Sequence, residues 1–149
     1  MLPNGNLIWR GAVGLKLQLV RNGHVIFEIP MSIKEWSREM LENEMNSIEE
    51  DFQRFSKIFD ALSNETRLRM MRQFLMEEDA SVRFADLMQD LDLNPKIVWE
   101  NLGKLSQCGF LEKTGRGKYR CSEFGQRAFM LMSLAMRRLL EIIKEIEEI

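Results

Sequence analysis

The stretch NPKIVWENLGKLSQCGFLEKTGRGKYRC, residues Asn94–Cys121, holds the pattern that decides the fold. Asn94 is a preferred residue just before a helix, and Pro95 suits the first helical position, where its missing N–H costs nothing. The inner positions of this helix, spaced four and three residues apart, are Val98, Leu102 and Leu105. Two short strand candidates, FLEK and KYRC, then enclose the glycine-containing turn Thr114–Gly117. The stretch therefore predicts a helix followed by a β-hairpin.

Two shorter helices are predicted upstream of this stretch. The turn Ser63–Thr66 can cap the first of them, and its buried stripe is Leu68, Met71, Phe74 and Leu75. The second fits RFADLMQDL, residues 83–91, and the tight turn Asp92–Leu93 joins it to the helix that begins at Asn94. Two short helices joined by a tight turn are a helix-turn-helix. We therefore interpret residues 63–122 as a winged helix-turn-helix core.

Long heptad-patterned helices are predicted on both sides of the core. The first covers residues 32–62, with Ser32 and Glu35 as a capping box, and the second covers residues 123–149. Such a seam packs either on the core of its own domain or against a second chain. We expect a homodimer formed by these positions: Leu41, Met45, Ile48, Phe52, Phe129, Met132, Met136, Leu139 and Ile143.

Residues 1–31 read as a separate β-hairpin appendage. LKLQLV and HVIFEI flank Asn22-Gly23, a pair that favours two-residue hairpin turns. An isolated hairpin is only marginally stable, so it should dock on the rest of the chain or on a partner subunit. Its role is open between bracing the dimer, lining a ligand pocket and recruiting another protein. The predicted fold class is mainly α with small β.

Three segments in this order resemble the ArsR-type (arsenic-repressor) family of winged-helix transcriptional regulators. They are FDALSNETRLRMMRQFL, NPKIVWENLGKLSQCGFLEK and TGRGKY, and the resemblance covers about Phe52 to Leu140. It implies a dimeric DNA-binding regulator in which Arg67 and Arg69 are structural or adjacent to phosphate. The family more often has small polar residues where Trp99 stands, so this indole either packs on the domain or contacts DNA.

The local charge supports binding to double-stranded DNA. Asn94–Cys121 holds six basic and two acidic residues in a chain of net charge -2, whereas residues 33–62 hold four basic and eight acidic residues. Phosphates attract such a local basic patch. Asn101 suits adenine and Glu100 suits the amino group of cytosine. The expected DNA contacts are Lys96, Ile97, Trp99, Glu100, Asn101, Lys104, Lys113, Arg116 and Lys118.

No metal site or cofactor is predicted, and the effector stays open. Many members of the family sense metals through a Cys-x-Cys on the third helix or through His and Asp on the last, but neither helix holds these ligands here, and the single histidine is His24. Cys108 and Cys121 are either small buried residues or a redox pair. Pairing Lys113 with Lys118 would put Cys121 opposite Phe110, so a bridge would need distortion.

Other classes of protein are poorly supported. No Ser-His or Cys-His arrangement and no phosphate-binding loop can be proposed, so we expect no enzyme and no catalytic residues. The apolar run FMLMSLAM is far shorter than the roughly 20 residues that span a bilayer, and the start lacks a signal peptide, so we expect a cytoplasmic protein with no membrane partner. The alternative function is a winged-helix protein–protein interaction module of the transcription machinery, with little DNA affinity. Trp99 and the acidic long helix favour it.

Overall fold

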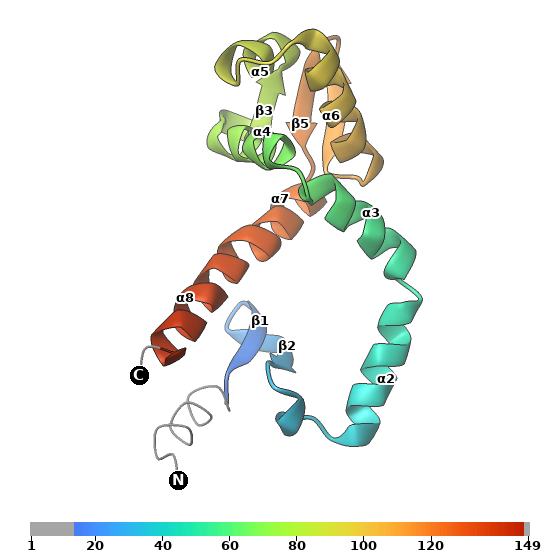
Figure 1. Ribbon diagram of the computed structural model, residues 1–149, viewed down its shortest axis with the longest axis vertical. Coiled ribbons are helices and arrows are strands. Elements are labelled where there is room, and N and C mark those ends of the chain that lie inside the picture. Colours follow the sequence, from blue (N-terminus) through green and yellow to red (C-terminus); the bar gives the residue numbers. More distant parts are fainter. Residues whose placement is uncertain (1–13, 148–149) are drawn as a thin grey trace. The chain divides into compact units, whose positions relative to one another are not determined.

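A computed structural model describes residues 14–147, which are mainly helical and carry two small antiparallel sheets (Figure 1). Residues 51–135 form one compact unit, and the segments on either side, up to Glu50 and from Met136, are assigned to a second. The unit of residues 51–135 extends beyond the predicted core of residues 63–122 at both ends, because the helices that flank this core pack with it. Within the described residues, no helix is both long and apolar enough to cross a lipid bilayer.

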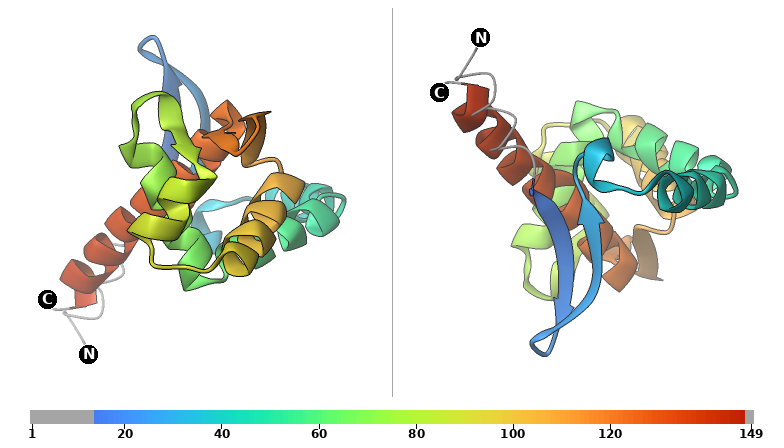
Figure 2. Two further views of the ribbon diagram at one scale, coloured as in Figure 1. Left: turned by 90° about the horizontal axis from the view of Figure 1, so that it is seen from above. Right: turned by 90° about the horizontal axis from the view of Figure 1, so that it is seen from below.

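The predicted N-terminal hairpin is confirmed as strands β1 (Lys16–Arg21) and β2 (His24–Pro30). Asn22 and Gly23 both have positive φ, as a two-residue turn of this kind requires. The register pairs Leu17 with Ile29 and Leu19 with Phe27, and it shifts by one residue after Leu19. One face of the hairpin is therefore apolar, and the ribbon is twisted along its length (Figure 2).

The single long helix predicted for residues 32–62 is wrong, because the structure divides it into three. Ser32 opens only the 3-10 turn η1 (Ile33–Glu35), and its hydroxyl accepts from the backbone N–H of Lys34. Helix α2 (Arg38–Glu49) has its own cap, Ser37, and helix α3 (Phe52–Leu62) begins after a non-helical Asp51.

The acidic run Glu49–Asp51 gives a physical reason for the break. Three carboxylates are unfavourable at the C-terminal end of α2, where the helix dipole is negative, but favourable at the N-terminal end of α3. The heptad spacing runs through this point without interruption, so hydrophobic periodicity alone gave no sign of it.

Residues 51–135 are built around one hydrophobic core. Helix α4 (Glu65–Met76) begins at Asn64, whose side chain accepts from the N–H of Arg67, and it packs against strands β3 (Ser81–Arg83) and β5 (Lys118–Cys121). Helices α5 (Phe84–Asp90) and α6 (Pro95–Gln107) pack on each other, and α6 also contacts α4 and strand β4 (Leu111–Gly115). The largest fully buried side chains are Phe74, Phe110, Met70, Met71, Leu87, Leu102, Leu105, Val98 and Cys121.

The second sheet has the strand order β3-β5-β4, so the β4–β5 hairpin gains a third strand from before α5. Leu111 is paired with Cys121, and the register shifts between Lys113 and Gly115. The predicted pairing of Lys113 with Lys118, which placed Cys121 opposite Phe110, is therefore wrong: the bulge moves the partner along by one residue.

The C-terminal helix begins where the sequence predicts, with Ser122 as its cap. Helix α7 (Glu123–Met130) continues through a π-helical turn, η3 (Leu131–Ala135), into helix α8 (Met136–Glu147). Gly125 brings α7 against the sheet, because a Cβ there would lie 2.4 Å from the carbonyl oxygen of Phe110. No larger residue fits this contact without a shift of the backbone.

Candidate nucleic-acid interface

Helix α6 has one buried side and one exposed side. Asn94 accepts from the N–H of Ile97 at 2.9 Å and fixes the start of the helix. Lys96 and Glu100 are exposed on the outer side, with the ammonium nitrogen 3.9 Å from a carboxylate oxygen. Trp99 is 68% exposed. Of the two interpretations of this indole, packing on its own domain is therefore not what the structure has.

Two other candidate residues of α6 are engaged within the protein. Asn101 is half-buried, and its amide accepts from Arg67 and donates to the carbonyl of Ile97. Lys104 lies 3.4 Å from a carboxylate oxygen of Asp60 on α3. A direct contact of Asn101 with adenine would have to use the remaining lone pair of Oδ1 and the remaining N–H of Nδ2. Lys104 lies near the C-terminal end of α6, away from Lys96.

The turn between β4 and β5 carries three exposed cations, Lys113, Arg116 and Lys118. Figure 1 shows this turn and the N-terminal end of α6 at the same end of residues 51–135. In the described part of the chain, no carboxylate pairs with any of the three cations. The fourth cation of the hairpin, Arg120, is different, because it lies 3.2 Å from Glu112.

Arg83 is a fourth member of this cluster, and the sequence analysis missed it. It ends β3 directly opposite Lys118, and the N–H of the next residue, Phe84, donates to the carbonyl of Gly117 at 2.9 Å. Like charges at directly opposed positions of a sheet destabilise it, and a bound anion would relieve this repulsion. We define Arg83, Lys113, Arg116 and Lys118 as the basic cluster, in which Lys113, paired with Tyr119, is on the other face of the sheet from Arg83 and Lys118.

A signal for Arg83 was present in the sequence. Ser81-Val82-Arg83 alternates polar and apolar residues, which is typical of a short strand. Arg83 is placed instead in the predicted helix RFADLMQDL, residues 83–91, whereas the structure begins that helix at Phe84. Only the pairing with β5, more than 30 residues further along the chain, turns it into a strand.

Both cysteines are free thiols. Burial raises the pKa of Cys108, and burial together with the nearby Glu112 carboxylate raises the pKa of Cys121 to about 11. At neutral pH both groups are therefore protonated, and the thiol of Cys108 donates to the carbonyl of Leu105 at 3.3 Å. Neither has the depressed pKa that a reactive cysteine requires.

The structure also places the other chemistry-bearing groups. Over residues 14–147, no cluster of three or more His, Cys, Asp or Glu side chains could hold a metal ion, and His24 lies at the hairpin turn opposite Arg21. An open cavity of about 470 Å³ lies beside the ends of α3 and α6. It is lined by Lys57, Asp60, Ala61, Lys104, Gln107 and Cys108.

The predicted dimer positions fall into two groups. Phe129 is only 9% exposed and lies in the core of residues 51–135, and Met132 packs against that core, so neither is freely available to a second chain. The remaining predicted positions are exposed or half-buried: Leu41, Met45, Ile48, Phe52, Met136, Leu139 and Ile143. On α3 the seam residues Phe52 and Phe59 are exposed, whereas Ile58 and Ala61 lie in the core and Leu62 packs against it.

Comparisons with known proteins leave the family open. No family model matches the chain, and no curated protein matches its sequence. The function must therefore be argued from the site itself.

Proposed function

We propose that residues 51–135 are a winged helix-turn-helix and that the chain is an ArsR-like, DNA-binding transcriptional regulator. In this proposal α5 and α6 form the helix-turn-helix, α6 enters the major groove, and the β4–β5 hairpin is the wing. The order of elements from α4 to β5, the tight turn at Asp92 and the three-stranded sheet all support it.

The observation that carries the proposal is the basic cluster. Its four cations have no carboxylate partner within the described residues, and two of them, Arg83 and Lys118, repel each other across the sheet. The β4–β5 turn lies at the end of the unit where the exposed N-terminal half of α6 begins (Figure 1). Phosphates of a duplex whose groove receives α6 would neutralise them.

The active form in this proposal is a homodimer. Phe52 and Phe59 on α3, and Met136 and Ile143 on α8, are large apolar side chains that are exposed in the single chain. Apolar stripes at heptad spacing pair with a second helix. A two-fold dimer would set two α6 helices at the distance of successive major grooves, roughly 34 Å. The proposal includes no metal effector.

The test is DNA binding as a function of salt. Labelled mixed genomic fragments are titrated at several ionic strengths with wild type and with Arg116→Ala/Lys118→Ala. The double variant should bind more weakly, and its slope of log K against log salt should be shallower by about two.

A control variant tests whether the salt dependence comes from the charge of the β4–β5 hairpin or from the total charge of the chain. Arg38→Ala/Arg127→Ala removes the same charge from two exposed arginines that pair with glutamates on their own helices. It should leave the slope unchanged. Absence of wild-type binding at low salt would refute the proposal.

One observation favours the second candidate, a protein–protein interaction module. Ile97 and Trp99 both expose apolar surface on the outer side of α6, and aromatic anchors of this kind are enriched at protein interfaces. This function predicts no DNA binding at low salt, together with protection of α6 amides from hydrogen exchange when purified RNA polymerase is added.

A further inference from the structure

Arg67 is the one charged or polar residue that the described part of the chain buries, with 6% of its surface exposed. It lies in the first turn of α4, between α3 and α6. A buried charge is costly unless it is compensated. The partners of Arg67 therefore show what the fold gains by keeping it.

Two partners of Arg67 belong to the last turn of α3. Its Nε donates to the carbonyl of Ala61 at 2.6 Å, and its Nη2 donates to the carbonyl of Asp60 at 3.0 Å. Carbonyls in the last turn of a helix lack intrahelical donors and carry the negative end of the helix dipole. The end of a helix, rather than a carboxylate, thus compensates the guanidinium.

The third partner of Arg67 is on α6. Its Nη1 donates to Oδ1 of Asn101 at 2.8 Å, and the Nδ2 of Asn101 donates to the carbonyl of Ile97 at 2.8 Å. One planar guanidinium therefore connects the end of α3 with the middle of α6. A lysine could not reproduce this connection, because its single ammonium lacks the fork geometry.

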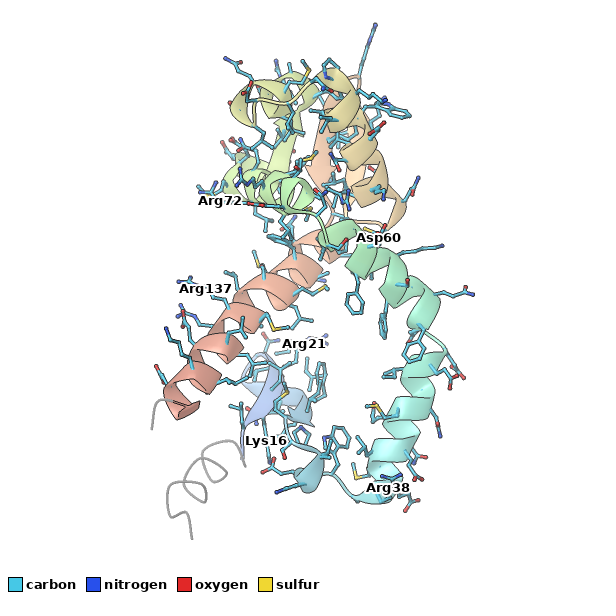
Figure 3. All side chains as sticks on the ribbon, in the orientation of Figure 1. Lys16, Arg21, Arg38, Asp60, Arg72 and Arg137 are labelled. Carbon is cyan, nitrogen blue, oxygen red and sulfur yellow. The ribbon has the colours of Figure 1, made fainter. Side chains whose placement is uncertain are left out.

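A weaker second link joins the same two helices. Asp60, which Figure 3 labels at the end of α3, accepts from Arg67 through its backbone and lies 3.4 Å from Lys104 through its side chain. Both side chains of this ion pair are half-exposed or more. Exposed pairs contribute little, so Arg67 is the stronger of these two polar links between α3 and α6.

We propose that Arg67 is a positioning residue: it holds α6 against the end of α3, and DNA affinity depends on it although it does not touch DNA. This inference rests on the proposed function. It also gives Asn101 a new role: its side chain accepts the hydrogen bond of Arg67 and does not read adenine.

The test is a double-mutant cycle on the full chain. Arg67→Lys, Asn101→Ala and the double variant are compared with wild type for binding to several unrelated DNA fragments. Each single variant should weaken binding about tenfold on every fragment, and the double variant should be no weaker than the weaker-binding single variant. Arg72→Lys, the same substitution at an exposed arginine of the same helix, should leave the binding unchanged.

The outcomes separate the alternatives. Additive effects in the cycle, or wild-type binding by folded Arg67→Lys, would overturn the proposal. So would a loss of preference at a single base pair in Asn101→Ala alone, because that result would make Asn101 a base reader. If Arg67→Lys fails to fold, Asn101→Ala with the same fragments still decides between the two roles.

Hydrogen exchange of the α6 amides tests the positioning role of Arg67 independently of the proposed DNA-binding function. If wild type binds no DNA, the proposed function fails, but the link can still be measured. Amides of α6 should then exchange faster in Asn101→Ala and Arg67→Lys than in wild type, whereas amides of α7 should not. Unchanged exchange in α6 would overturn the positioning role whatever the DNA result.

Discussion

Phe74 and Phe27 are the same side chain in opposite surroundings. Phe74 on α4 is fully buried in the core of residues 51–135, whereas Phe27 on the hairpin is 46% exposed beside Leu19, which is also exposed. The comparison extends to the neighbouring elements, because α2 buries none of its residues fully. The central unit encloses a hydrophobic core, although Phe52, Phe59 and Trp99 remain exposed on its surface, whereas neither α2 nor the hairpin has a buried residue. The exposed apolar side chains of the flanks are the ones that the proposed homodimer would cover, together with Phe52 and Phe59 of α3.

The largest expected effect comes from removing the same phenyl ring from each of the two regions. Phe74→Ala should lower the free energy of unfolding by about 3–5 kcal/mol, because it leaves a cavity in a closed core. Phe27→Ala should cost the isolated chain less than about 1 kcal/mol, since nearly half of the ring is already in water. Urea unfolding at low protein concentration measures both. Similar losses would mean that the hairpin is packed in solution.

Assembly is the next largest effect. Met136→Glu should raise the dissociation constant of the homodimer at least about a hundredfold, because it would bury an unpaired charge. Arg137→Glu, a change to the same residue at the neighbouring exposed position that leaves the apolar stripe intact, is the matched control. Sedimentation velocity gives the association state. If the wild type is a monomer, no dimer sets the distance between two α6 helices, and this part of the proposed function is refuted even if the chain still binds DNA.

Alkaline pH should reveal the buried thiol of Cys121. Its pKa is raised from 9.0 to about 11 in the folded chain, so the unfolded state loses its proton first as the pH rises. The stability contributed by this thiol should therefore be complete below pH 9 and fall between about 9 and 11. Thermal unfolding of wild type and Cys121→Ala across this range checks it: the variant should show a smaller decline, and an equal decline would assign the loss to other groups.

The smallest effect concerns the basic cluster. Arg83→Gln removes one of two like charges that face each other across the sheet, so it should raise stability by about 0.2–1 kcal/mol. The same variant should bind DNA more weakly. A stabilised variant with unchanged DNA affinity would show that Arg83 lies outside the interface.

Much of the central unit could be predicted from local signals. Asn94 with Pro95, Ser122 as a cap, and the Asn22-Gly23 turn all act through neighbouring atoms, and all three are confirmed. The break before α3 could not be predicted from periodicity, because the heptad spacing crosses it unchanged.

The missed features depend on residues far apart in the chain. Arg83 is in a strand only because β5 pairs with it, and Asn101 is occupied because Arg67, 34 residues earlier, reaches it. No local pattern encodes either contact. The sequence thus placed the cations of the β4–β5 turn correctly on one hairpin, yet it assigned Asn101 a free amide that the folded protein does not have.

The basic cluster also bears on purification. A chain with net charge -2 and an isoelectric point near 5.6 is expected to be repelled by polyanionic resins at neutral pH. The four cations of the basic cluster should outweigh this negative net charge, because a sulfated polymer responds to the local electrostatic potential rather than to the net charge of the chain. A heparin column should therefore retain the protein, and an anion exchanger should retain it as well through the acidic segment that precedes the core.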